Sequence, residues 1–270
     1  MNRTVRLLLA CFAVWSLCNP CGAGDKKQLL LIGQRRDNHP PTTHEFMAGL
    51  RVLEESLRRI AAVEVRTVQS DEPWPEGPEL IRRADGIVLY VSEGAKWMAA
   101  DPRRQDAIAQ LAARGGGLTA LHWGIGCKDQ GFVAAFTQLF GGCHGGPDRR
   151  YQVLDTRLRP AEPAHPITRG LEPLEIHDEF YYRLKRPTGE SQPQAVLTAT
   201  IDGQEEIVSL AWQRPDGGRS FGFTGLHFHD NWRQPFYRRL VAQGVLWTLK
   251  VDIPAAGVDV DVDERVLKLP

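Results

Sequence analysis

The sequence predicts an α/β protein with a doubly wound, mostly parallel sheet and a β-rich C-terminal elaboration. Two observations carry this prediction. Up to about residue 145, short apolar runs alternate with helical patterns, which indicates repeated β-α units. From about residue 151, strand-like segments follow one another with turn residues between them. The 270 residues suffice for a sizeable core, and we expect one domain over residues 25–251.

Each element of the first half has its own local signal. A helix is expected over residues 44–60, where apolar side chains recur on one side. A second helix is expected to begin at Asp101-Pro102, the favoured N-cap and N1 order, and to end at Arg114 before three glycines. The expected strands are the apolar runs 28–33, 63–68, 86–91 and 118–122.

The second half is expected to be mainly strands, separated by turns such as residues 214–218. Whether the last of these strands returns to the main sheet stays open. A final helix is expected over residues 235–249, and residues 252–270 are expected to form an irregular tail. The expected strands are residues 151–158, 179–185, 195–201, 206–213 and 220–225.

Residues 1–24 have the pattern of a secretory signal peptide. Two arginines precede an apolar run over residues 7–17, and small residues follow at 21–24. We therefore expect a secreted or periplasmic protein with no stable membrane anchor, because the run is too short to span a bilayer. A buried first helix and a lipoprotein modified at Cys11 are the weaker alternatives.

Charge and cysteine content narrow the function further. Without residues 1–24 the chain has 31 basic and 33 acidic residues, a net charge of about −2, so nucleic acid is a poor candidate partner. The sequence also has no phosphate-binding loop and no dinucleotide fingerprint. Only Cys127 and Cys143 remain, which is too few for a disulfide scaffold; one bridge or two buried thiols are both open.

Histidines gather where the sheet is expected to have its site. In an open parallel sheet, ligands bind beyond the carboxyl ends of the strands. Imidazole serves there either as an acid or base near neutral pH or as a metal ligand. We predict His39, His44, His227 and His229 as candidate ligands of a divalent metal such as zinc. The histidines in loops at or near this edge are His39, His44, His122, His144, His227 and His229.

His122 is the strongest catalytic candidate. Residues 118–124 read as a buried strand followed by a sharp turn into a helix, which exposes one side chain above the sheet, as in a nucleophile elbow. Glu93 and Asp178 are predicted to assist. Asp178 and Glu179 would point to opposite faces of a strand, so we expect one to reach the site and the other to be solvated.

Several motifs, in this order and spacing, resemble those of the ThuA-like (trehalose-utilisation) family over about residues 28–251. The chain departs from that family at Leu226, where a glycine is frequent, and at residues 143–146, where a longer aromatic-rich stretch is expected. The motifs that carry the resemblance are His39 with His44-Glu45, Gly115-Gly116-Gly117 with Leu121-His122, residues 165–171, residues 178–181, residues 221–229 and residues 244–247.

The resemblance implies a flavodoxin-like fold of the class I glutamine amidotransferase type and a role in trehalose or keto-sugar metabolism. A cysteine would stand at His122 in an amidotransferase, so glutamine hydrolysis through a thioester is not available. We expect a small-molecule carbohydrate as partner and leave a homodimer open. Proton removal beside a keto group fits the histidines better than nucleophilic hydrolysis, although isomerase, lyase and hydrolase reactions all remain open.

Aromatic residues near this edge are the predicted substrate contacts, namely Trp123, Tyr181 and Trp232. A non-catalytic sugar-binding module is the alternative to an enzyme, and its mark would be aromatic platforms at Trp97, Trp123 and Trp232. An inactive amidotransferase-like scaffold is a third possibility, which an exposed apolar surface would favour.

Overall fold

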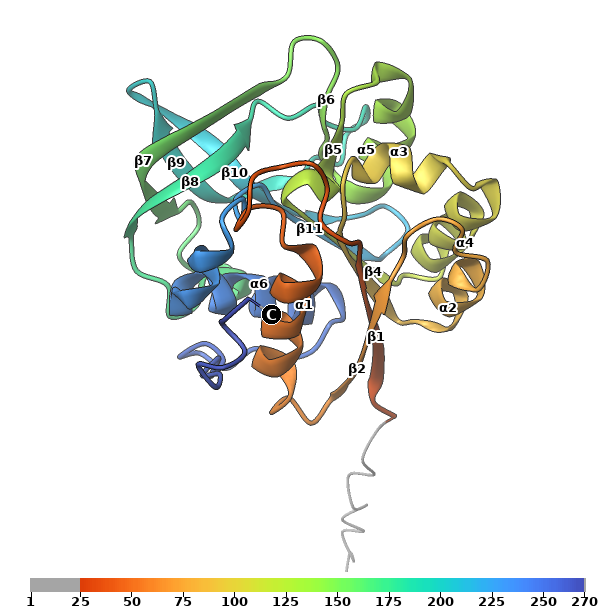
Figure 1. The fold of residues 1–270 in the computed structure, drawn as a ribbon, viewed down its shortest axis with the longest axis horizontal. Helices are drawn as coiled ribbons and strands as arrows, with labels where there is room; N and C mark the ends of the chain where they lie inside the picture. Colours follow the sequence, from red (N-terminus) through yellow and green to blue (C-terminus); the bar gives the residue numbers. More distant parts are fainter. Residues whose placement is uncertain (1–24, 270) are drawn as a thin grey trace, which may run out of the picture.

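The computed structural model describes residues 25–269 and has one nine-stranded sheet at its centre (Figure 1). The signal-peptide prediction falls on residues 1–24, outside this range. The sheet has the strand order β2-β1-β3-β4-β11-β10-β9-β7-β8. Five of its strands are parallel, and they are β1 (Lys27–Gly33), β2 (Val63–Gln69), β3 (Gly86–Tyr90), β4 (Gly117–Leu121) and β11 (Arg219–Phe223).

The parallel half confirms the predicted fold class. Its order, with β11 as the fifth strand, is the flavodoxin-like order of a doubly wound sheet. β3 and β4 are buried at every position, because helices cover both faces of the sheet there, and this explains their continuous apolar sequences. The open question about the last strand is settled, since β11 returns to lie parallel beside β4.

The antiparallel half extends the sheet from β11. β10 pairs with β11, β9 with β10, β7 with the end of β9, and β8 with β7. The strand predicted over residues 179–185 is wrong in its bounds, because β8 begins at Leu174 and ends at Tyr182. These strands are β7 (Arg150–Pro160), β8 (Leu174–Tyr182), β9 (Gln194–Ile201) and β10 (Gln204–Gln213).

Helices form two layers with separate apolar cores. α1 (Phe46–Leu57) and α6 (Pro235–Thr248) lie side by side on one face and contribute to the larger core (Figure 1). None of the helices within residues 25–269 is both long and apolar enough to cross a membrane. The other face is covered by α2 (Gly77–Arg83), α3 (Gly94–Ala99), α4 (Pro102–Ala113) and α5 (Val133–Phe140).

The C-terminal segment has no helix or strand over residues 252–269, yet it packs against the larger core. Arg238 donates to the carbonyl of Val260, and the Gln243 side chain accepts from the backbone of Val258. These contacts fix the segment against α6.

On the opposite face of the large sheet, the short strands β5 (Gly126–Cys127) and β6 (His144–Gly145) pair with each other. Cys127 and Cys143 are buried free thiols.

Candidate metal centre

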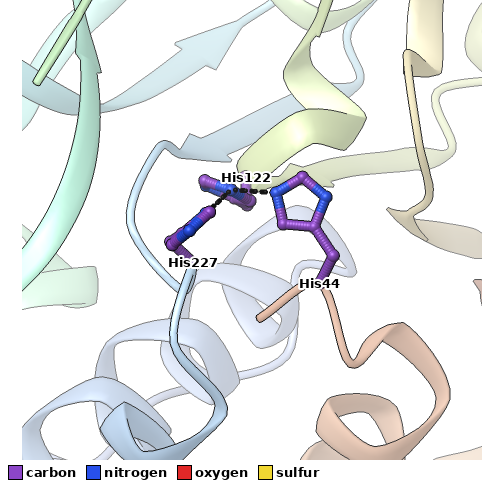
Figure 2. Close-up of side chains that lie close together, drawn as sticks. All are labelled: His44, His122 and His227. Carbon is purple, nitrogen blue, oxygen red and sulfur yellow. Dashed lines mark hydrogen bonds between the residues drawn. The ribbon is translucent and has the colours of Figure 1, made fainter. Parts of the chain in front are cut away.

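Three histidines from three loops converge above the parallel strands (Figure 2). His44 follows β1, His122 follows β4 and His227 follows β11. Nε2 of His122 lies 3.0 Å from Nε2 of His44 and 3.2 Å from Nδ1 of His227. Nitrogens that share a tetrahedral zinc ion at about 2.0–2.1 Å lie roughly 3.3 Å apart. This three-histidine centre therefore has the donor atoms and spacing to hold a metal ion.

The hydrogen bonds behind the rings fix two of the tautomers. Nδ1 of His122 donates to the carbonyl oxygen of Thr224 at 2.9 Å, and Nδ1 of His44 donates to the Asp37 carboxylate at 2.8 Å. In the neutral rings, each Nε2 atom then carries a lone pair. Two lone pairs 3.0 Å apart repel each other unless a cation or a proton lies between them. Carbonyl and carboxylate partners of this kind orient histidines that bind metals.

Burial keeps these rings neutral. It holds the pKa of His122 well below its usual range, and the neighbouring His44 and His227 lower it further. Burial also lowers the pKa of His227 to about 4 and lowers that of His44, where the Asp37 carboxylate opposes the shift. Because only a neutral imidazole offers a lone pair, the centre is prepared to bind a metal near neutral pH.

The turn at His122 has the strained geometry that its sequence predicts. His122 has φ 47°, a left-handed conformation that a histidine rarely adopts, and it begins a 3-10 helix over His122–Ile125 directly after β4. The loop after β3 lies tightly against this turn. A Cβ atom at position 94 would lie 2.0 Å from the carbonyl oxygen of Gly124, so only glycine fits there. Such strain is typical of functional sites.

Strand β8 brings a carboxyl group and a phenol to the centre. Oε1 of Glu179 lies 3.7 Å from Nδ1 of His227 and 3.9 Å from Nε2 of His122. The hydroxyl of Tyr181 lies 3.1 Å from the same His122 nitrogen, and the two rings stack at a centroid distance of 4.8 Å. Burial raises the pKa of Glu179 to about 7. This carboxyl can therefore donate or accept a proton near neutral pH.

Asp178 points to the opposite side of β8 and does not face the three rings. Its carboxylate accepts hydrogen bonds from the backbone of Leu226 at 2.7 Å and of His227 at 3.1 Å, and from the hydroxyl of Tyr237 at 2.9 Å. Burial raises its pKa to about 6 despite these donors. The expectation that one member of the Asp178–Glu179 pair is solvated is wrong, since both are largely buried.

Two other predicted metal ligands, His39 and His229, are not part of the three-histidine centre. His39 lies at its rim, stacked on His44 at 3.6 Å, with Nδ1 2.6 Å from Asp37. Asp37, His39 and His44 form a second group that could hold an ion. His229 does not join either group, because the chain turns into a 3-10 helix at this residue and its Nε2 atom lies 3.1 Å from the carbonyl oxygen of Leu267.

The remaining predicted site residues have structural contacts. Glu93, which also has a left-handed backbone, accepts from the backbone N–H of Lys128 at 2.8 Å. Trp123 packs against the rings of Tyr181 and His144. Trp232 is fully buried against Tyr90 and Gly49, so it cannot contact a substrate directly. The predicted tryptophan platforms of a sugar-binding module are therefore missing, because Trp97, Trp123 and Trp232 are at most 7% exposed.

Asp37 was not predicted as part of the centre, and Glu179 was left open as one of two adjacent carboxylates of which one would reach it. Asp37 stands two residues before His39 in the same loop, and an acidic residue beside a histidine pair was an available signal. Of the Asp178–Glu179 pair, only Asp178 was named as a catalytic candidate. The position of Glu179 depends on which side of β8 faces the histidines, and that information is not local to the strand.

At Leu226, where the chain has leucine in place of the family's frequent glycine, the backbone is strained. Leu226 has φ 78° and is fully buried. Its N–H donates to the Asp178 carboxylate, and its carbonyl oxygen accepts a hydrogen bond from the Tyr90 hydroxyl at 2.6 Å. At this φ glycine is unstrained, whereas alanine keeps a penalty of about 1 kcal/mol. We expect Leu226→Ala and Leu226→Gly both to lose about 2–5 kcal/mol through the cavity, with Gly no worse than Ala.

Urea denaturation of the two variants checks this order. At an ordinary helix or strand position glycine is less stable than alanine by roughly 0.5–1 kcal/mol. Leu246, buried in α6 at a position with ordinary helical geometry, is the reference for the opposite case, and Leu246→Gly is expected to be less stable than Leu246→Ala. A Leu226→Gly protein clearly less stable than Leu226→Ala would show that this residue is not strained.

Comparisons with known proteins agree with this fold. A family model described as "ThuA: Trehalose utilisation" matches residues 30–248. A ThuA-like protein from Parabacteroides merdae has a similar structure, with a TM-score of 0.63 and 16% identity over 91% of this chain and 100% of that one. A ThuA-like protein from Bacteroides uniformis also has a TM-score of 0.63, with 12% identity over 90% and 98% of the two chains.

A more distant structural match is PurLQS from Thermotoga maritima. It has a TM-score of 0.45 and 17% identity over 83% of this chain and 98% of that one. No curated protein matches the sequence. At their identities, the two ThuA-like structures support the fold alone.

Proposed function

The chain belongs to the ThuA (trehalose utilisation) family, and from this premise we propose that it is an enzyme acting on a sugar or keto-glycoside at the three-histidine centre. The family description supports a carbohydrate substrate. The residue above β4 is His122, so the thioester chemistry of a glutamine amidotransferase is not available at this turn. Export of the mature chain, residues 25–270, is part of the same proposal and rests on the pattern of residues 1–24.

We propose that His44, His122 and His227 bind a divalent cation such as zinc. The observation that carries this is the 3.0 Å separation of two Nε2 atoms whose other ring nitrogens both donate hydrogen bonds. When bound, the cation would supply Lewis-acid polarisation of a carbonyl or hydroxyl oxygen of the sugar. His39 lies at the rim of the centre, where it contacts His44 and Asp37.

The side chains around the centre have separate roles in this proposal. Glu179, whose Oε1 atom lies 3.7 Å from Nδ1 of His227, accepts or donates a proton at a carbon or hydroxyl group of the sugar. Tyr181 stacks on His122 and holds its hydroxyl 3.1 Å from Nε2, where it can donate a hydrogen bond to an oxygen of the substrate. Asp37 and the Thr224 carbonyl keep His44 and His122 in the tautomers that leave Nε2 free.

These groups favour proton transfer beside a keto group, as in an isomerisation or an elimination. Glu179 places the carboxyl group that such a proton transfer needs beside the centre, with Oε1 3.7 Å from Nδ1 of His227. Nucleophilic hydrolysis would need an activated nucleophile at the elbow, and a histidine occupies that position. A hydrolase, with Glu179 assisting water, is the alternative reaction class.

The metal content of the mature chain tests this proposal directly. Residues 25–270, purified without a histidine tag, are expected to retain about one equivalent of zinc after dialysis, because one convergent set of three neutral imidazoles is a high-affinity site. His44→Ala is expected to lose the ion. His177→Ala is the matched control, since His177 is half exposed and contacts Asp155. A wild-type protein that binds no zinc, manganese or iron would contradict the metal proposal.

A further inference from the structure

The parallel half of the sheet ends at β2, whose outer edge pairs with no other strand of residues 25–269 (Figure 1). On its inner side, β2 pairs with β1 over all seven of its residues in one regular register. An edge strand turns a row of backbone N–H and C=O groups outward, where another strand can pair with them. Proteins commonly block such edges with lysine, proline or a bulge, and β2, Val63–Gln69, has none of these.

The helices leave the side chains of β2 accessible on both faces. Glu64 and Arg66 are exposed, and Val65 between them is half-buried. On the α1 face, β2 borders a hollow of about 940 Å³, which the C-terminal segment also lines. On the α2 face, a smaller hollow of about 160 Å³ lies beside Arg66 and is also lined by Leu80. Neither helix layer closes over this edge, so its side chains can meet those of a second strand.

Two copies of β2 can pair with each other only in certain registers. In an antiparallel pair, directly opposite residues point to the same face of the sheet, whereas consecutive residues of a strand point to opposite faces. A two-fold axis between two such strands therefore pairs one residue with its own copy, never with its neighbour in the sequence. A register centred on Glu64 or on Arg66 would place two identical charges directly opposite each other.

The register centred on Val65 is complementary to itself. It places Val65 opposite its own copy, and Glu64 of each copy opposite Arg66 of the other. Val63 then lies opposite Thr67 of the other copy. Opposite charges in directly opposite positions stabilise an antiparallel pair, and like charges there destabilise it. The symmetry produces this favourable pair of charges twice, so the charges on β2 favour a second copy of the same strand.

The strand at the other end of the sheet lacks this property. β8 has three carboxyl groups, those of Glu175, Asp178 and Glu179, and it has no lysine or arginine. Two copies of β8 placed side by side would therefore repel each other. Charge complementarity distinguishes β2 from β8 as the edge at which two copies meet.

We propose that the protein forms a symmetric dimer through antiparallel pairing of β2 with β2 of a second copy, in the register centred on Val65. The two nine-stranded sheets then form one continuous sheet. One strand pair buries less surface than a standard protein interface, so we expect a dissociation constant of about 1–100 µM. This interface is independent of the proposed function, because it involves none of the residues of the three-histidine centre.

Sedimentation of the mature chain, residues 25–270, over roughly 1–500 µM tests the dimer. Glu64→Arg and Arg66→Glu are each expected to raise the dissociation constant about tenfold or more, because like charges then lie opposite each other at two places. Arg186→Glu is the matched control. Arg186 is exposed between β8 and β9, so the same change of charge there should alter the dissociation constant less than about twofold.

An equal mixture of Glu64→Arg and Arg66→Glu tests the register. It is expected to dimerise about as tightly as the wild type, because two arginines of one copy then lie opposite two glutamates of the other. The double variant with both changes is expected to do the same on its own. Circular dichroism shows that each variant is folded.

A wild-type chain that stays monomeric up to about 500 µM would overturn the proposal. So would a dimer that both single variants leave intact, or folded single variants whose mixture does not dimerise. Zinc content is expected to be the same in all of these folded variants, since Glu64 and Arg66 lie outside the metal centre. Loss of the dimer and absence of zinc are therefore separate results, and each contradicts only one of the two proposals.

Discussion

Replacement of His122 by alanine is expected to abolish zinc binding by the mature protein. His122 supplies the central nitrogen, which lies 3.0 Å from Nε2 of His44 and 3.2 Å from Nδ1 of His227. Its loss leaves only two of the three metal ligands. Removal of a partner behind a ligand already costs roughly 10- to 100-fold in metal affinity. Removal of the central ligand should exceed that, and competition with a chelator of known zinc affinity measures the change.

Folding of the variant has to be separated from metal binding. His122 is fully buried and has φ 47°, and alanine would be strained in that conformation. His122→Asn is the second variant, because asparagine tolerates left-handed backbone geometry better than most residues. Circular dichroism shows whether each variant is folded. A folded His122→Asn or His122→Ala protein whose zinc affinity stays within threefold of wild type would refute the three-histidine centre.

Replacement of Asp178 by alanine is expected to cause the largest loss of stability, about 3–5 kcal/mol. The change removes the acceptor of three backbone N–H groups, from Leu226, His227 and Glu179, and of the Tyr237 hydroxyl. A buried donor without a partner costs about 1–3 kcal/mol, and four such costs do not add fully. Asp178→Asn keeps one acceptor oxygen and should lose less. The midpoint and slope of urea denaturation give the free energy of unfolding.

Asp155→Ala is the matched control for this prediction. Asp155 lies on the neighbouring strand β7, and its side chain is 90% exposed, so its removal should change stability by less than about 0.5 kcal/mol. A loss below 1 kcal/mol in Asp178→Ala would mean that the Leu226–His227 backbone does not depend on this carboxylate. Zinc affinity is expected to fall in Asp178→Asn as well, because Asp178 orients the backbone of a ligand, His227.

The sequence by itself determined the architecture and the edge at which the site lies. Apolar runs such as residues 86–91 can be buried on both faces only in a sheet covered on both sides, and their alternation with helices leads to parallel order. Because parallel strands end at the same edge, residues that follow different strands had to come near one another. This is how His44, His122 and His227 could be grouped although they are far apart in the chain.

Which of the edge residues meet was decided by tertiary structure. The two-residue spacing of His227 and His229 places both rings on one side only if the backbone stays extended, and a 3-10 helix begins at His229. The alternation of Asp178 and Glu179 was visible in the sequence. Which of the two faces the histidines was not, because it depends on how the β7–β8 hairpin packs across the loop after β11. The local sequence pattern fixes which side chains point to the same face of a strand. Which residues then lie against each face is set by contacts between segments that are distant in the chain.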